Sequence, residues 1–211
     1  MSWSEIGEFV KAVAPGFTAA AACTAAWIGW HGLEKWRSET LGKRKAEIAE
    51  TTLASVYEME EILRLARSPW VQPHETAKKE GLPDEVATDP NYAPEARLLE
   101  HQEFFGRFRT QKFAFAAVFG RDAAQALDGL WQCRLEINRA VDNLLRNKEM
   151  SPRNRDMRTI DAEDRAAWEE WYYTAFRPMR GNDALVGKRI SEYVSAIEAT
   201  CRPAIEARAN P

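Results

Sequence analysis

The feature that most constrains this chain lies near its start, where residues 12–33 contain no Asp, Glu, Lys or Arg. A helix needs about 20 predominantly apolar residues to cross the hydrocarbon core of a bilayer, and this stretch reaches that length. Much of it is alanine, which contributes little insertion free energy, whereas Phe17, Ile28 and Leu33 contribute more. The stretch therefore predicts one transmembrane helix with a modest insertion free energy.

The residues at the C-terminal end of this stretch are typical of a membrane interface. Indole rings prefer the interface, and cations accumulate in cytoplasmic segments. Only one cation, Lys11, precedes the stretch. This asymmetry predicts an N-terminus outside the cytoplasm, an interfacial and transmembrane part over residues 1–35, and a cytoplasmic part over residues 36–211. The predicted membrane-interface residues are Trp27, Trp30, Lys35, Trp36, Arg37, Lys43, Arg44 and Lys45.

Three other interpretations of residues 12–33 remain open. A secretory signal peptide has a basic leader, but the first ten residues contain Glu5 and Glu8 and no cation. Residues 20–23 weakly resemble a lipoprotein cleavage site, with Ala20 at the position that leucine usually holds. A buried helix of a soluble protein is the third alternative, because the hydrophobicity of the stretch is low.

Small residues within the stretch form rows at helical spacing. Gly16, Ala20 and Thr24 lie four residues apart, and small side chains let two helices approach closely in lipid. An alanine-rich segment also produces such rows by chance. The row predicts self-association through the membrane helix, with composition as the alternative explanation.

Residues 36–211 are predicted to be all-α. Apolar residues recur at helical spacing in five segments, and the breaks between them fall at proline or glycine. This pattern predicts an antiparallel bundle of about four helices with one long loop at residues 69–93. The predicted helices span residues 38 or 40 to 67, then 94–119, 122–147, 161–176 and 183–200.

Local signals set the expected ends of these helices. Pro69 disfavours a helical conformation at the residue before it, so the first helix should end there. Gly120 suits a left-handed cap, and Asp122 with Gln125 resembles a capping box. Proline is tolerated in a first helical turn and disruptive in a helix interior, so Pro15 should begin the membrane helix and Pro203 should end or kink the last helix.

Composition excludes several classes of function. The chain has 211 residues, a hydrophobic fraction of 45% and a charged fraction of 29%, which suit a folded protein. Its net charge is -3 and its cations are interspersed with acidic residues, so the sequence shows no basic patch of the kind that binds a nucleic acid. The three cysteines lie far apart without a CxxC pair, which argues against a disulfide framework and a structural zinc site.

Catalytic signatures are also missing from the sequence. It contains no HExxH, GxSxG, GxxxxGK[ST] or GxGxxG motif, and no cofactor or metal site is predicted. His74 beside Glu75 could form an acid-base pair, because a carboxylate next to an imidazole raises its pKa. Adjacent residues seldom face one another, which favours a solvated loop at this position.

A few polar residues interrupt the apolar faces of the expected helices. A lone charge in a core costs several kcal/mol, so residues in such positions are normally paired or hydrogen-bonded. We expect Glu60 and Arg134 to be partly buried and within reach of each other or of a substitute partner. An ion pair that fixes helix register is the simpler explanation of their placement. The candidate buried polar residues are Glu60, His101, Arg134 and Asn138.

Short segments spread along the chain carry a resemblance to known sequences. They are residues 36–47, Arg67-Ser68-Pro69, Phe119-Gly120, and Glu198 with Cys201-Arg202-Pro203. With them the chain resembles uncharacterised bacterial single-pass membrane proteins that carry a cytoplasmic helical domain. The resemblance covers most of the chain, implies a place in the bacterial inner membrane, and implies no activity.

Two functional hypotheses follow. The first is a membrane-anchored interaction or sensor module, in which the helical domain binds a protein partner at the cytoplasmic face. The second is a membrane-surface enzyme that uses an unrecognised polar cluster near the 69–93 loop. The lack of a known catalytic constellation favours the first hypothesis.

Overall fold

The computed structural model describes the backbone of residues 3–76, 83–151, 161–179, 183 and 186–209, and the side chains of these residues from 24 to 208. All regular structure in these ranges is helical, which confirms the all-α prediction. The chain divides into two compact units, residues 1–45 and residues 46–211. The predicted boundary, after residue 35, falls earlier along the same helix.

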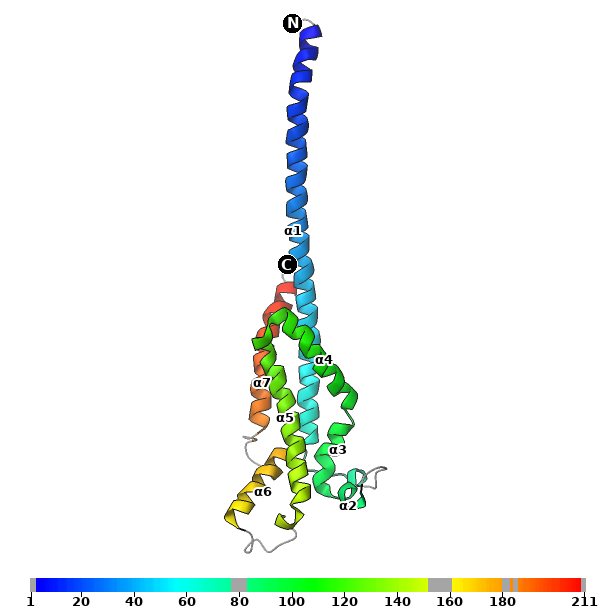
Figure 1. Ribbon diagram of the computed structural model, residues 1–211, viewed down its shortest axis with the longest axis vertical. Coiled ribbons are helices and arrows are strands. Elements are labelled where there is room, and N and C mark those ends of the chain that lie inside the picture. Colours follow the sequence, from blue (N-terminus) through cyan, green and yellow to red (C-terminus); the bar gives the residue numbers. More distant parts are fainter. Residues whose placement is uncertain (1–2, 77–82, 152–160, 180–182, 184–185, 210–211) are drawn as a thin grey trace. The chain divides into compact units, whose positions relative to one another are not determined.

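The first helix, α1, spans Trp3–Ala66 and crosses from the first unit into the second (Figure 1). The separate helices expected before and after residue 38 are therefore one, and Pro15 lies within this helix instead of beginning it. The C-terminal end of α1 lies where Ser68-Pro69 predicts it.

In the first unit, each described side chain, from Thr24 to Lys45, is exposed. In the second unit, α1 presents a buried face from Ala46 onward, which includes Ala49, Val56, Met59 and Leu63. The i, i+3, i+4 and i+7 spacing of these apolar residues produces that face.

Helix α5, Arg121–Arg146, lies in the middle of the second unit (Figure 1). Helices α3 (Ala93–Leu99), α4 (Gln102–Phe119), α6 (Ala162–Ala175) and α7 (Gly187–Ala209) all contact it. One core cluster joins side chains of α1, α3, α4, α5 and α7, and a smaller one joins α5 and α6 around Val141, Leu144 and Phe176.

Helices α5 and α7 pack closely at one glycine. A Cβ built on Gly129 would lie only 2.4 Å from the Tyr193 ring, so the missing side chain lets the ring lie against the α5 backbone.

The chain reverses at Gly120, so that α5 runs back from the end of α4 (Figure 1). Its φ of 91° and ψ of 162° lie in a region that glycine alone adopts readily, but this is not the left-handed helical conformation expected. Because α5 begins directly at Arg121, Gly120 is its N-cap and no side chain caps the helix. The capping box is therefore wrong, and Asp122 lies in the first turn, where its charge favours the helix dipole.

Three further expectations change. The helix expected over 94–119 is two helices, separated at Glu100 and His101 without a proline or glycine to mark the break. The last helix does not end at Pro203 but continues to Ala209. The described part of the 69–93 loop contains the short helices η1 (Pro73–Thr76), α2 (Asp84–Ala87) and η2 (Pro90–Tyr92).

Candidate functional site

The C-terminal end of α1 is held by a side chain from α3. The last carbonyls of a helix have no partner within the helix. Arg97 donates Nη1–H to the carbonyl oxygens of Ala66 at 3.0 Å and Ser68 at 2.7 Å, and Nη2–H to that of Trp70 at 2.7 Å. Arg97 therefore caps α1 and fixes the path of the chain that leaves it.

Glu75 neutralises the charge of Arg97. Its carboxylate accepts Nε–H of Arg97 at 2.5 Å and Nη2–H at 2.8 Å, and it also accepts the backbone N–H of Gln72 at 2.6 Å. The hydrogen bond from Arg97 is the main cause that holds the pKa of the Glu75 carboxyl below its usual value, against the opposing effect of burial. Glu75 is thus committed to Arg97, and His74 is exposed beside it.

A second arginine joins the end of α1 to the end of α6. Arg67 is only 2% exposed, and it donates to the carbonyl oxygens of Thr174 at 2.9 Å and Tyr173 at 2.8 Å. Its two terminal nitrogens also bind the carboxylate of Asp183, at 2.5 and 3.0 Å. The arginine therefore ties α1, the last turn of α6 and the segment before α7 together.

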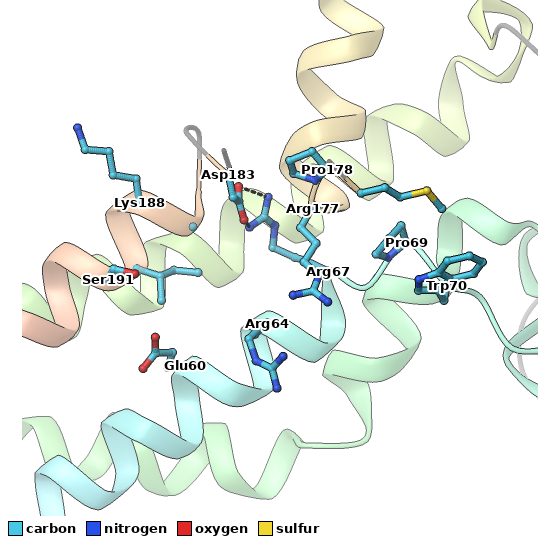
Figure 2. Close-up of a pocket in the computed structure, with 13 residues that line it drawn as sticks. Glu60, Arg64, Arg67, Pro69, Trp70, Arg177, Pro178, Asp183, Lys188 and Ser191 are labelled. Carbon is cyan, nitrogen blue, oxygen red and sulfur yellow. Dashed lines mark hydrogen bonds and ion pairs between the residues drawn. The ribbon is translucent and has the colours of Figure 1, made fainter. Parts of the chain in front are cut away.

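An open cleft of about 990 Å³ lies beside Arg67 (Figure 2). It is bounded by the last turns of α1, the residues that follow α6, and the first turns of α7. Its lining residues are Glu60, Arg64, Arg67, Pro69, Trp70, Arg177, Pro178, Met179, Asp183, Gly187, Lys188, Ile190 and Ser191.

Most cations of the cleft already have a carboxylate partner. Arg67 pairs with Asp183, and Arg64 pairs with Glu61. Lys188 lies 3.7 Å from Glu192 one turn along α7, and Figure 2 shows its side chain extending away from the other cations.

Arg177 is different from these three cations. Its backbone N–H binds the carbonyl oxygen of Arg67 at 2.7 Å, but its half-buried guanidinium makes no ion pair or hydrogen bond with any residue in the described ranges. The hydrogen bond from Arg64 is the main cause that lowers the pKa of the Glu61 carboxyl, and the charge of Arg177 adds a smaller effect in the same direction. Among the described residues that line this cleft, Arg177 is the cation available to a ligand.

Two large apolar side chains also line the cleft without being covered. Trp70 is 68% exposed and Met179 is 66% exposed. The segments that carry them are fixed by Arg97 at the Trp70 carbonyl and by the bond between Arg177 and Arg67. The cleft therefore combines a cation with an apolar surface on an anchored backbone.

The residues predicted to be buried polar groups lie in different places. Glu60 is half-buried and lines the cleft, whereas Arg134 is half-buried between α4 and α5, and no ion pair joins the two in the part of the chain described. His101 and Asn138 are also half-buried. The His101 carbonyl accepts the Phe105 N–H at 3.1 Å, at the start of α4.

Aromatic rings take the place of a carboxylate at Arg134. Its guanidinium carbon lies 4.2 Å from the centre of the Phe105 ring and 4.9 Å from that of the Trp131 ring. Such contacts stabilise a desolvated cation by about 2 kcal/mol. Burial lowers the pKa of Arg134, and its Nε is one of the buried polar atoms without a hydrogen-bond partner among the described residues.

The residues predicted to lie at a membrane interface are all exposed: Trp27, Trp30, Lys35, Trp36, Arg37, Lys43, Arg44 and Lys45. Gly16 and Ala20 fall among residues 1–23, whose side chains lie outside the described part, and Thr24 is exposed. Within the stretches that the structure describes, no helix is both long and apolar enough to cross a membrane.

The described side chains that could hold a metal ion or act as thiol nucleophiles are dispersed or buried. No group of three or more His, Cys, Asp or Glu side chains among them is arranged to hold a metal ion. Cys133 and Cys201 are buried, and burial raises the pKa of each thiol to about 11, which keeps both protonated near neutral pH. A protonated thiol is a poor nucleophile.

Sequence reasoning missed three residues that line the cleft, Arg67, Asp183 and Arg177, and it missed Arg97 as the partner of Glu75. Arg67 carried a signal, because it lies four residues after Leu63 and so continues the buried face of α1. No known protein family, curated protein or solved structure matches the chain.

Proposed function

We propose that this chain is a membrane-anchored helical interaction module, in which residues 46–211 bind a protein partner through the cleft at the end of α1. Its N-terminal helix would hold the module at the bacterial inner membrane, with the helical domain in the cytoplasm and the lipid bilayer as a second partner.

The observation that carries this proposal is the exposed pair Trp70 and Met179 beside Arg177, whose guanidinium has no ion-pair partner among the described residues. Exposed apolar surface rimmed by polar residues is typical of interaction sites. Tryptophan and arginine are also the residues that contribute most to binding free energy at protein interfaces.

The proposed membrane anchor is supported by the distribution of exposed apolar residues in the first unit. They are Trp27, Ile28, Trp30, Leu33, Trp36 and Leu41. At about 100° per residue, these side chains point to all sides of the helix instead of forming one stripe. Trp27, Ile28, Trp30 and Leu33 belong to the uncharged stretch 12–33, where apolar side chains on several faces of the helix suit lipid better than a groove on one partner. Each cation that follows adds about 1 kcal/mol of attraction to anionic headgroups.

The second hypothesis, an enzyme with its polar cluster near the 69–93 loop, receives less support. Glu75, the buried carboxylate in that region, is paired with Arg97, and Arg97 caps the end of α1.

Purification of the full-length chain from detergent-solubilised membranes tests the interaction module. We expect a stoichiometric protein partner that can be reconstituted from purified components. A co-purifying small molecule or metal without a protein would support the enzyme instead.

Carbonate washing of membranes, combined with reporter fusions at both termini, tests the anchor. We expect the chain in the washed membrane fraction with its C-terminal reporter in the cytoplasm. Recovery in the soluble fraction would contradict the anchor, and an exported C-terminal reporter would reverse the topology.

A further inference from the structure

We infer that the cleft at the end of α1 binds a protein segment in which a single carboxylate adjoins an apolar side chain, with the carboxylate on Arg177 and the apolar group against Trp70 and Met179. This inference rests on the proposed interaction function and names the chemistry of the partner.

The charge balance of the cleft identifies the polar part of the ligand. Three of its four cations have carboxylate partners, which leaves the guanidinium of Arg177 as the unpaired one among the described residues. A guanidinium binds a carboxylate through two parallel hydrogen bonds, and such charge-assisted bonds are stronger than neutral ones. A half-buried, unpaired guanidinium therefore gains most from a ligand carboxylate.

The same balance argues against ligands with more negative charge. A phosphate group carries close to two negative charges at neutral pH, and one free guanidinium neutralises only one of them. The lining residue Glu60 has no ion-pair partner within the described part of the chain, so a second negative charge would also meet a like charge. A singly charged side chain fits this arrangement better than a phosphate or an acidic run.

The apolar part of the ligand follows from Trp70 and Met179. Both side chains are about two-thirds exposed, and the backbone of each segment is held by an arginine, the half-buried Arg97 at Trp70 and the buried Arg67 near Met179. An aliphatic or aromatic side chain that covers them gains roughly 25 cal/mol per Å² of apolar surface removed from water. Methionine adapts to ligand side chains of different shape.

Isothermal titration calorimetry on the full-length chain in mild detergent tests the inference. The probes are acetylated and amidated octapeptides with one central glutamate between two leucines, and matched peptides with glutamine or phosphoserine in its place. We expect the glutamate peptide to bind about tenfold or more tightly than the glutamine peptide, as a hydrogen-bonded charge pair requires.

Single substitutions test which residues cause the preference for the glutamate peptide. Arg177→Gln should remove the preference for glutamate over glutamine, whereas Arg107→Gln, an exposed arginine of α4 outside the cleft, should keep it. Trp70→Ala should lower the affinity for the glutamate peptide and for the glutamine peptide by a similar factor. Circular dichroism confirms that each variant remains folded.

Several results would overturn the inference: no binding of the glutamate peptide, a glutamate preference that survives Arg177→Gln, or tighter binding of the phosphoserine peptide. Competition by phosphatidylglycerol vesicles that depends on Arg177 would also overturn it, because it would assign the cleft to lipid headgroups.

A parallel purification separates this inference from the proposed function. If Arg177→Gln captures the protein partner as well as wild type does, the inference fails and the interaction module stands. If neither protein captures a partner, the interaction module itself fails.

Discussion

The two parts of α1 use the same helical backbone for different purposes. Over residues 24–45 each side chain is exposed, and the large apolar residues point to all sides. Over residues 46–66 the apolar residues form one face, and Ala46, Ala49 and Leu63 are completely buried in a protein core. Helical hydrogen bonding is common to both parts, so the difference lies in what covers the side chains.

The C-terminal end of the buried part is held by hydrogen bonds from two arginines. Arg97 and Arg67 fasten its C-terminal end to η1 and to the end of α6. The ion pair described for the exposed part, Lys35 with Glu39 at 4.0 Å, lies in solvent. Substitutions in the buried part should therefore change folding stability, and substitutions in the exposed part should change association.

The largest effect is expected at Arg67. Arg67→Met leaves the Asp183 carboxylate and two carbonyl groups without their partner, and breaking a buried ion pair costs about 3–5 kcal/mol. Urea unfolding followed by circular dichroism measures the loss. Arg64→Met is the matched control, since the exposed pair with Glu61 should contribute at most about 1 kcal/mol. Equal effects of the two substitutions would contradict the assignment of Arg67 as the link between α1 and α6.

Leucine truncation compares the two parts of α1 directly. Leu63 is 0% exposed and Leu41 is 68% exposed. Leu63→Ala should lower the free energy of unfolding by about 3 kcal/mol, because it removes buried methyl groups and leaves a cavity. Leu41→Ala should change it by less than about 0.5 kcal/mol. A comparable loss at Leu41 in the same urea titration would mean that protein covers this side chain.

How far the sequence predicts this fold depends on the strength of the local pattern. Helices α5 and α6 were predicted to within one residue at each end, because their apolar periodicity is regular and their flanks carry turn residues. The break between α3 and α4 could not be predicted, since Glu100 and His101 are compatible with a helix. The continuation of α7 past Pro203 shows that the surrounding helix can outweigh a local breaker.

The cleft depends on partners that are distant in sequence. Arg67 and Asp183 are 116 residues apart, and no local pattern pairs them. Arg67 itself could have been found, because it continues the buried face of α1 after Leu63. The availability of Arg177 could not have been predicted, because it follows from which carboxylates the neighbouring cations already bind.

The Glu75–Arg97 contact predicts a pH dependence. The hydrogen bond from Arg97 lowers the pKa of Glu75 in the folded chain, so this contact stabilises the fold fully above the ordinary glutamate pKa of about 4.3. Stability should then fall as the pH drops through the lower folded pKa. Glu75→Gln should cost about 2 kcal/mol at neutral pH and flatten the acid limb of a stability-pH curve. Glu39→Gln, in the exposed part of α1, should leave both the stability and the curve unchanged.

The smallest effect on folding, and a clear effect on location, is expected for the exposed tryptophans of the first unit. Trp27 and Trp30 are exposed, and neither belongs to a core cluster of the described residues. Replacing both by alanine should therefore change the free energy of unfolding of the second unit by less than about 0.5 kcal/mol, as is typical of surface sites. If lipid covers them in the cell, the same change removes apolar side chains worth about 1.5–3 kcal/mol each, and partitioning into phosphatidylglycerol-containing vesicles should fall by at least about tenfold. Vesicle sedimentation measures this partitioning, with Leu63→Ala as the control that lowers stability and leaves the membrane-binding residues intact. A large loss of folding stability in the double variant would show that the two rings pack against protein, and the contrast between the two parts of α1 would then disappear.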